Sequence, residues 1–205
     1  VQLRKHFPDM FRELRTIALL RLVDQISSAR MIQPCFLDSY MSDICSGLAV
    51  SEGTVRKFIS RLGTLQERTE RFMQEQVMPG STLLFDGTSL FTRSADSLAA
   101  KGYNPDRSLN PQARILYVFE KDSHRPVFYR VLQGSVVDKA AFLDTVEAAG
   151  CKDCVIIADK GFYSKRNVSA LQNAAMRYIL PLQDNTVNVE NEFYADPDDR
   201  KWDGV

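Results

Sequence analysis

The chain has 205 residues, of which 44% are hydrophobic and 25% charged, and its formal net charge is zero. This composition is typical of a globular protein with one or two domains, and no apolar run approaches the roughly 20 residues that span a bilayer, so we expect no membrane protein. A net charge of zero neither requires nor excludes a nucleic-acid partner, which leaves local clusters of charge to decide.

The first 80 residues are expected to form an all-helical region. Apolar residues recur at helical spacing from Met10 to Ile26. A second helical unit is predicted from Phe36 to Gly63, with two short helices around a turn and Ser51 as the N-cap of the second helix. Strand signals are almost absent from this region.

Pro79-Gly80-Ser81 breaks the helical pattern, and we place the start of a second domain, residues 81–205, at this point. The second domain alternates short apolar runs with helices, expected at the following positions: strands Thr82–Asp86, Arg114–Glu120, Val127–Leu132, Val155–Ala158 and Tyr178–Leu182, and helices from Asp138 to about Ala149 and from Ser164 to about Met176. The second and third strands should pair as a hairpin, and Asp138 and Ser164 can cap the two helices.

The predicted order is strand, strand, strand, helix, strand, helix, strand, which is the order of a ribonuclease H-like core in the α/β class. Such a core has a mixed sheet, in which three antiparallel strands are extended by parallel ones. We expect the first strand to be half buried and the fourth to be buried on both faces.

Two aspartates mark a candidate metal site. Asp86 lies near the first predicted strand and Asp159 directly follows the fourth, and these strands are neighbours in the expected sheet. Either aspartate alone is readily explained as a turn former or a cap, but two adjacent carboxylates repel one another unless they share a cation or a proton. Magnesium prefers carboxylate oxygens, and enzymes that transfer phosphoryl groups use such acids to hold two metal ions.

The residues after Asp159 suit a phosphate ligand. Lys160 can meet a phosphate, Gly161 permits a sharp turn, and a helix N-terminus favours anions. Three basic residues in this segment are candidate nucleic-acid contacts: Lys160, Lys165 and Arg166.

The segment Asp159-x-Gly161-Phe162-Tyr163-Ser164, with Asn167, resembles the second-aspartate motif of insertion-sequence transposases of the DDE class. Other segments are similar to the family in the same order: Gly102 to Gln112, Pro126 with Val127, Gly134, and Asp138. The resemblance implies a ribonuclease H-like DNA transposase that cleaves strands and transfers them with Mg²⁺ or Mn²⁺, using Asp86 and Asp159 as catalytic metal ligands. It also implies two ions in the complete enzyme, double-stranded DNA (element ends and target) as the partner, a homodimer, and association with the bacterial nucleoid when DNA is bound. The stretch from Val1 to Met10 lacks the apolar core of a signal peptide, so the chain is expected in the cytoplasm.

Two departures from the family pattern concern Ser135, which stands where the family usually has Asn, and the third acid. The family's third acid is a Glu in a Tyr-Arg-x-x-Glu-Lys arrangement, which does not occur here. Glu190 and Glu192 follow the last strand too soon, in an acidic stretch that we interpret as solvated loop. The chain also opens on Val1 rather than Met. We therefore expect an inactive fragment that is truncated before the third acid.

The unit from Phe36 to Gly63 has the length of a helix-turn-helix, and its second helix would present Arg56, Lys57 and Arg61 to DNA. The alternative is an amphipathic helix with a solvated basic face. Two other functions therefore stay open. One is a DNA-binding protein without catalysis that uses the helical region, and the other is a hydrolytic nuclease on the same fold.

Cys151 and Cys154 have the spacing of a zinc or redox pair, but no second pair follows. We expect reduced, partly buried thiols. His124 lies in the predicted hairpin turn and is expected to be exposed.

Overall fold

The computed structural model describes residues 2–93, 98–102 and 110–182. The chain divides into two compact units, Val1–Phe72 and Met73–Val205, so the division precedes the expected boundary at residue 80. The family-like segment between residues 103 and 109, and the acids Glu190 and Glu192, lie outside the described residues. No helix in the described ranges has both the length and the apolarity that a membrane crossing requires.

The helical unit begins with a short helix and continues through four more, and a sixth helix leads out of it: α1 (Gln2–His6), α2 (Phe11–Val23), α3 (Ala29–Leu37), α4 (Met41–Ile44), α5 (Glu52–Gly63) and α6 (Gln66–Gln74). Its core is an apolar cluster of α2, α3 and α5 that includes Leu20, Ile32 and Val55. Ser51 caps α5 by accepting a hydrogen bond from the amide of Thr54, as predicted. The first of the two helices predicted between Phe36 and Gly63 is reduced to the end of α3 and the four-residue α4.

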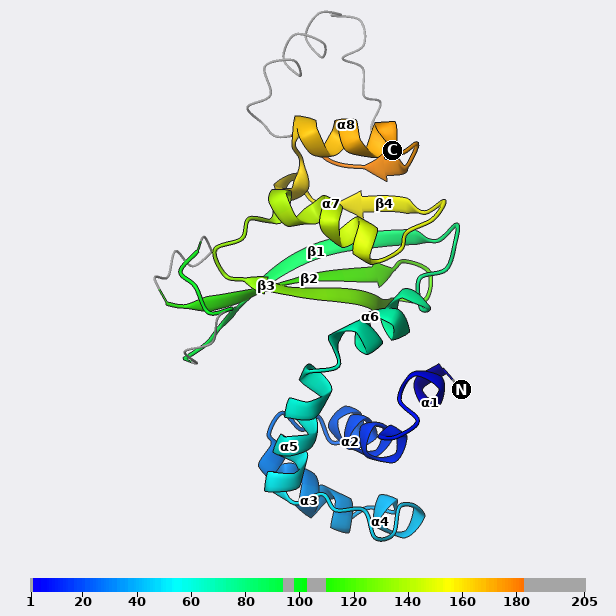
Figure 1. Ribbon diagram of the computed structural model, residues 1–205, viewed down its shortest axis with the longest axis vertical. Helices are drawn as coiled ribbons and strands as arrows, with labels where there is room; N and C mark the ends of the chain where they lie inside the picture. The colour runs from blue at the N-terminus through cyan, green and yellow to red at the C-terminus, as the bar shows by residue number, and fades with distance from the viewer. Residues whose placement is uncertain (1, 94–97, 103–109, 183–205) are drawn as a thin grey trace, which may run out of the picture. The chain divides into compact units, whose positions relative to one another are not determined.

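The second unit is built around one sheet, and its elements are β1 (Thr82–Phe91), β2 (Gln112–Glu120), β3 (Arg125–Gln133), α7 (Asp138–Ala148), β4 (Val155–Ala158), η1 (Lys160–Phe162), α8 (Lys165–Asn173) and β5 (Arg177–Ile179). The strand order is β3-β2-β1-β4-β5, in which β1, β2 and β3 are antiparallel and β4 and β5 run parallel to β1. This arrangement confirms the predicted hairpin and the ribonuclease H-like fold (Figure 1).

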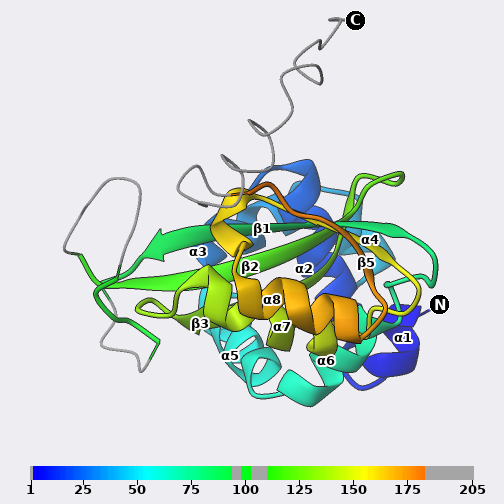
Figure 2. The ribbon, with the colours of Figure 1, turned by 90° about the horizontal axis from the view of Figure 1, so that it is seen from above.

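Helices α7 and α8 lie on the same side of the sheet (Figure 2). Phe85 of β1 contacts Phe142 of α7, with ring centroids 5.4 Å apart, which identifies the sheet face that α7 covers. On β4, Ile156 and Ala158 are buried whereas Val155 and Ile157 are half-buried. Among the described residues, helices cover only one face of β4. The expectation that β4 is buried on both faces is therefore wrong.

Two further expectations need correction. The first strand was expected to stop at Asp86, because Gly87-Thr88-Ser89 has the composition of a turn, but β1 stays paired with β2 as far as Phe91. Asp138 does not cap α7, since Val137 occupies the N-cap position and Asp138 is the first helical residue. Ser164 caps α8 as predicted, by accepting a hydrogen bond from the amide of Asn167.

Two glycines allow a loop to lie directly on the end of the sheet. A Cβ atom on Gly134 would lie 1.9 Å from the carbonyl oxygen of Gln112, and one on Gly102 would lie 1.9 Å from the carbonyl oxygen of Gly134. Backbone hydrogen bonds join the same segments, from Gly134 to Leu98 and in both directions between Ala100 and Gln112. Close backbone approach explains why these positions carry glycine.

Candidate active site

The pairing of β1 with β4 brings the two candidate acids together. Phe85 of β1 pairs with Ala158 of β4, so Asp86, the next residue of β1, lies beside Asp159, which directly follows β4. Adjacent strands lie about 4.8 Å apart, and Asp159 keeps an extended backbone with φ −74° and ψ 174°. Since side chains alternate along a strand and Phe85 faces α7, the side chain of Asp86 belongs to the opposite face.

Both carboxylates are exposed and each is oriented by a nearby backbone amide. Oδ1 of Asp159 accepts a hydrogen bond of 2.8 Å from the amide of Gly161, which makes Asp159 the N-cap of η1. Oδ1 of Asp86 accepts one of 2.8 Å from the amide of Gly87. A Cβ on Gly161 would lie 2.9 Å from Oδ1 of Asp159, so the glycine allows the carboxylate to stay close to the turn. Each carboxylate thus keeps its second oxygen available to a ligand.

Aromatic side chains lie beside Asp86 on the same sheet face. Tyr117 pairs directly with Asp86 across β1 and β2, and Tyr129 pairs with Tyr117 across β2 and β3. The ring centroids of the two tyrosines are 6.4 Å apart, and Tyr129 is 42% exposed. The acid pair is therefore bordered by a partly exposed aromatic surface.

Another acidic residue, Asp138, lies near β1, but its carboxylate is engaged by an arginine. Its carboxylate is on the α7 side of the sheet, where both oxygens accept hydrogen bonds from the guanidinium of Arg114. Both side chains are largely buried, with 13% of Arg114 and 16% of Asp138 exposed. Within the described ranges, no three His, Cys, Asp or Glu residues are grouped so that they could hold a metal ion. The described acid site consists of two carboxylates.

The predicted basic residues of the sheet unit follow Asp159 directly. Lys160 is in η1, whereas Lys165 and Arg166 are in the first turn of α8, and all three are exposed. The segment from Asp159 to Arg166 thus carries one of the two acids and these three cations. Such a segment has the charge needed to approach a polyanion.

The predicted basic residues of the helical unit are mostly ion-paired. Arg56 contacts Glu52 at 2.8 Å within α5, and Arg61 contacts Asp9 at 2.7 Å. Asp9 also contacts Arg68, at 2.7 Å. Hydrogen bonding to its own backbone, followed by the hydrogen bond from Arg68, lowers the pKa of Asp9 below its usual value. Asp9 thus holds two of the cations that a DNA backbone would otherwise attract.

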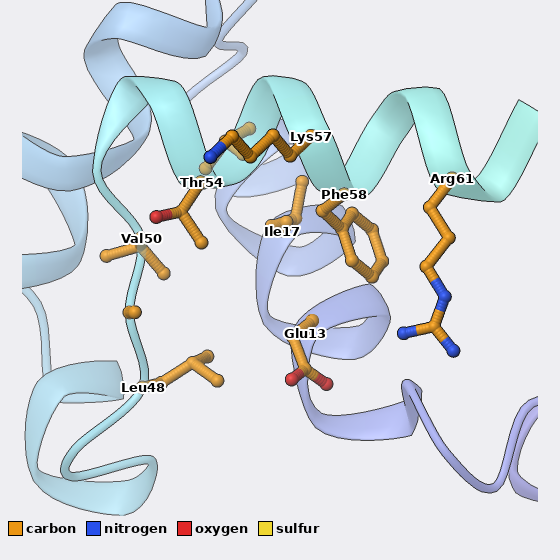
Figure 3. Close-up of a pocket in the computed structure, with 10 residues that line it drawn as sticks. Glu13, Ile17, Leu48, Val50, Thr54, Lys57, Phe58 and Arg61 are labelled. Atoms are coloured by element: carbon orange, nitrogen blue, oxygen red, sulfur yellow. The ribbon is translucent and has the colours of Figure 1, made fainter.

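A cavity of about 280 Å³ opens between α2 and α5 of the helical unit. Its wall is apolar at Ile17, Leu48 and Phe58, whereas Lys57 and Arg61 of α5 and Glu13 of α2 border it (Figure 3). Glu13 places a negative charge in the same cavity as the two basic residues. The cavity could not be predicted from sequence, since it depends on how the helices pack.

The cysteine pair does not form part of a recognisable ligand set in the described structure. Cys151 is half-buried and Cys154 is buried, and both are free thiols. Burial and the neighbouring Cys154 raise the pKa of Cys151 to about 12. A thiol with so high a pKa is a poor nucleophile at neutral pH. His124 is exposed in the hairpin turn, as predicted.

Two residues around the site were not recognised as such from sequence. The sequence predicts Arg114 only as the start of a strand, and no local signal marks it as the partner of Asp138. Asn167 belongs to the motif that resembles the family, and its side chain is buried and donates to the carbonyl oxygens of Lys139 and Phe162. The motif was the signal available for Asn167.

Comparison with known proteins gives one family match and several structural similarities. The family model described as a transposase DDE domain matches residues 78–201. No curated protein matches the chain. A piggyBac transposase in a synaptic complex with hairpin DNA, solved by cryo-EM, is 14% identical with a TM-score of 0.46, over 65% of this chain and 30% of that one. The Mos1 transposase in a paired-end complex with the left transposon end is 10% identical with a TM-score of 0.34, over 89% of this chain and 69% of that one.

Proposed function

Since the chain belongs to the transposase DDE-domain family, we propose that it carries part of a DNA-transposing active site in which Asp86 and Asp159 hold a divalent metal ion. The observation that carries the proposal is the register of β1 and β4. Because Phe85 pairs with Ala158, the exposed Asp86 and Asp159 each directly follow a residue of this pair.

The donor set fits a hard cation. Both residues offer carboxylate oxygens, which are the ligands that Mg²⁺ and Mn²⁺ prefer, and each has one oxygen that is not engaged by the adjacent backbone amide. Two carboxylates at neighbouring positions repel one another, and a shared cation relieves that repulsion. Two carboxylates give a weak site, because metal sites of this type draw on more acids when they hold two ions.

When bound, the metal supplies charge stabilisation to the oxygens that change partners during phosphoryl transfer. The chain's own residues have separate tasks. Asp86 and Asp159 orient the ion, and the exposed cations Lys160, Lys165 and Arg166 attract the phosphate backbone of double-stranded DNA to the turn after Asp159. Transfer to a 3′ hydroxyl makes this chemistry transposition, whereas transfer to water makes it nuclease activity.

A second candidate function is DNA binding by the helical unit, and the observation that favours it is the exposed Lys57 on α5. Arg56 and Arg61 contribute less to this function, since both already contact carboxylates. In this function α5 binds the phosphate backbone, and the sheet unit acts as its scaffold.

Metal titration of the 205-residue chain tests the proposal. Manganese should broaden the NMR signals of residues around Asp86 and Asp159, and Asp86→Asn and Asp159→Asn should each weaken this effect by at least tenfold. Asp122→Asn is the matched control, because Asp122 is an exposed aspartate in the β2–β3 turn. Equal broadening in all four proteins would contradict the proposal. A strand-transfer assay then separates transposition from nuclease activity.

A further inference from the structure

We propose that contacts from the first turns of α7 hold the backbone segments of the two acids in a fixed arrangement. We call these contacts the brace, and we propose that Asp138 and Asn167 are its positioning residues. The inference rests on the proposed function, because it concerns the same acid pair. Neither residue contacts a carboxylate of the pair directly, so each acts through the backbone that carries Asp86 or Asp159.

An aromatic row joins the two acid-bearing segments through α7. Phe85 immediately precedes Asp86, and Phe162 closes the 3₁₀ turn that Asp159 caps. Phe142 of α7 contacts both, with ring centroids 5.4 Å from Phe85 and 5.2 Å from Phe162. All three phenylalanines are buried, so β1 and η1 are packed against the same helical residue.

Asp138 ties the start of α7 to β1 and β2. Its two carboxylate oxygens accept from Arg114 of β2, and Arg114 also donates to Oγ of Ser89 on β1, at 3.2 Å. Gly87, the residue after Asp86, lies directly against this carboxylate, because a Cβ there would be 3.0 Å from Oδ1 of Asp138. The largely buried ion pair therefore fixes the backbone of β1 on the side opposite to the Asp86 side chain.

Asn167 ties the same turn of α7 to the segment after Asp159. Its side-chain Nδ2 donates to the carbonyl oxygen of Lys139 at 3.0 Å and to that of Phe162 at 2.9 Å. Lys139 follows Asp138 in the first turn of α7, and Phe162 ends the turn capped by Asp159. Asn167 is 2% exposed, so water cannot readily replace these two bonds.

The polar and aromatic links all meet between residues 138 and 142. Residues that orient metal ligands without touching the metal typically change metal affinity by about 10- to 100-fold when they are replaced. We therefore expect Asp138→Asn and Asn167→Ala to weaken manganese binding by about tenfold each, although both leave Asp86 and Asp159 intact.

The experiment combines manganese titration of the full 205-residue chain, followed by NMR line broadening, with hydrogen exchange of the Gly161 amide in the metal-free protein. That amide donates to Asp159 and reports the geometry of the turn. Val146→Ala is the control, because Val146 is a buried residue in the later part of α7, outside the brace. It should lower the melting temperature while it leaves manganese affinity within twofold and Gly161 exchange unchanged.

The brace is supported if manganese binding is weaker in both Asn167→Ala and Asp138→Asn and if the Gly161 amide exchanges faster in Asn167→Ala. Val146→Ala must show neither effect. Binding equal to the wild type in both positioning variants would overturn it, while the loss of binding in Asp86→Asn would keep the proposed function intact. Wild-type binding that does not depend on Asp86 or Asp159 would overturn both. If Asn167→Ala does not fold, Asn167→Ser and Asp138→Asn carry the same comparison.

Discussion

The two units hold their charged residues by different means. In the sheet unit, strand register places Asp86 and Asp159, and tight contacts at Gly87 and Gly161 support them. In the helical unit, exposed side-chain ion pairs hold the cations, as in the pair between Asp9 and Arg61. Exposed ion pairs contribute little to stability, whereas close backbone packing leaves no room for added atoms. Substitutions should therefore be costly where the backbone of the sheet unit is closely packed and mild around the cations of the helical unit.

The largest effect is expected for Gly134→Ala. The new Cβ would lie 1.9 Å from the carbonyl oxygen of Gln112 and 2.6 Å from that of Ala100, and neither backbone segment can move without breaking the pairing between them. We expect the free energy of unfolding to fall by about 3 kcal/mol, at the upper end for overpacking. Urea denaturation measures this loss. Gly63→Ala in α5 is the control from the other unit, because an added Cβ would meet nothing within 4 Å beyond its own stretch of helix, and it should not destabilise. Similar losses for both variants would remove the contrast between the units.

Gly87→Ala should have a smaller effect, about 1 to 2 kcal/mol, because its Cβ would meet a carboxylate rather than backbone. Arg114 holds that carboxylate in place, so it cannot simply rotate away. Combining Gly87→Ala with Asp138→Ala in a double-mutant cycle sharpens the test. The glycine substitution should cost less in the absence of the Asp138 side chain, and strict additivity of the two losses would argue against the contact.

The two units can also be compared through the reactivity of one cysteine in each, and the expected effect is similar in size to that of Gly87→Ala. Cys151 of the sheet unit and Cys35 of the helical unit are both half-buried, but burial and Cys154 raise the pKa of Cys151 to about 12. At pH 8 the reactive thiolate fraction of Cys151 is therefore very small, and it should increase with pH up to that pKa. Mass spectrometry after iodoacetamide labelling should show Cys151 reacting at least tenfold more slowly than Cys35 at pH 8. Faster labelling of Cys151 would contradict the raised pKa.

The smallest effect is expected for Asp9→Asn, which releases Arg61 and Arg68. Its folded pKa is lowered, so its carboxylate stabilises the fold above the usual value of 3.8 and loses this effect as the pH falls through the lowered value. At neutral pH the variant should bind double-stranded DNA a few-fold more tightly, with a steeper dependence on salt. Fluorescence anisotropy at several KCl concentrations measures both quantities. Lys57→Ala should act in the opposite direction, whereas unchanged binding in both variants would exclude the helical unit from DNA contact.

Much of the sheet unit could be predicted from sequence, because its strands are short apolar runs separated by turns. The same runs gave the order of elements and the adjacency of Asp86 and Asp159. The length of β1 was not predictable, since Gly87-Thr88-Ser89 is typical of a turn and pairing with β2 overrides that preference. The Arg114–Asp138 pair was also missed, because it depends on the register between a strand and a helix that are 24 residues apart in sequence.

The sequence predicted less about the helical unit. It located α2 and α5 and the cap at Ser51, because helical spacing and capping are local properties. It identified Arg56 and Arg61 as available cations, but the structure pairs them with Glu52 and Asp9. Asp9 is 52 residues from Arg61, and charge counting along the chain does not reveal such a partner.

The register of β1 also determines which mutations of the gene this site can tolerate. Successive strand residues point to opposite faces, so deletion of one residue between Thr82 and Phe85 would shift Asp86 into the place of Phe85, against Phe142. The same deletion would move Phe85 into the place of Leu84, on the face of the sheet where the carboxylate had been. A substitution along this stretch changes one side chain, whereas the loss of one codon moves buried side chains to the exposed face and exposed side chains to the buried face.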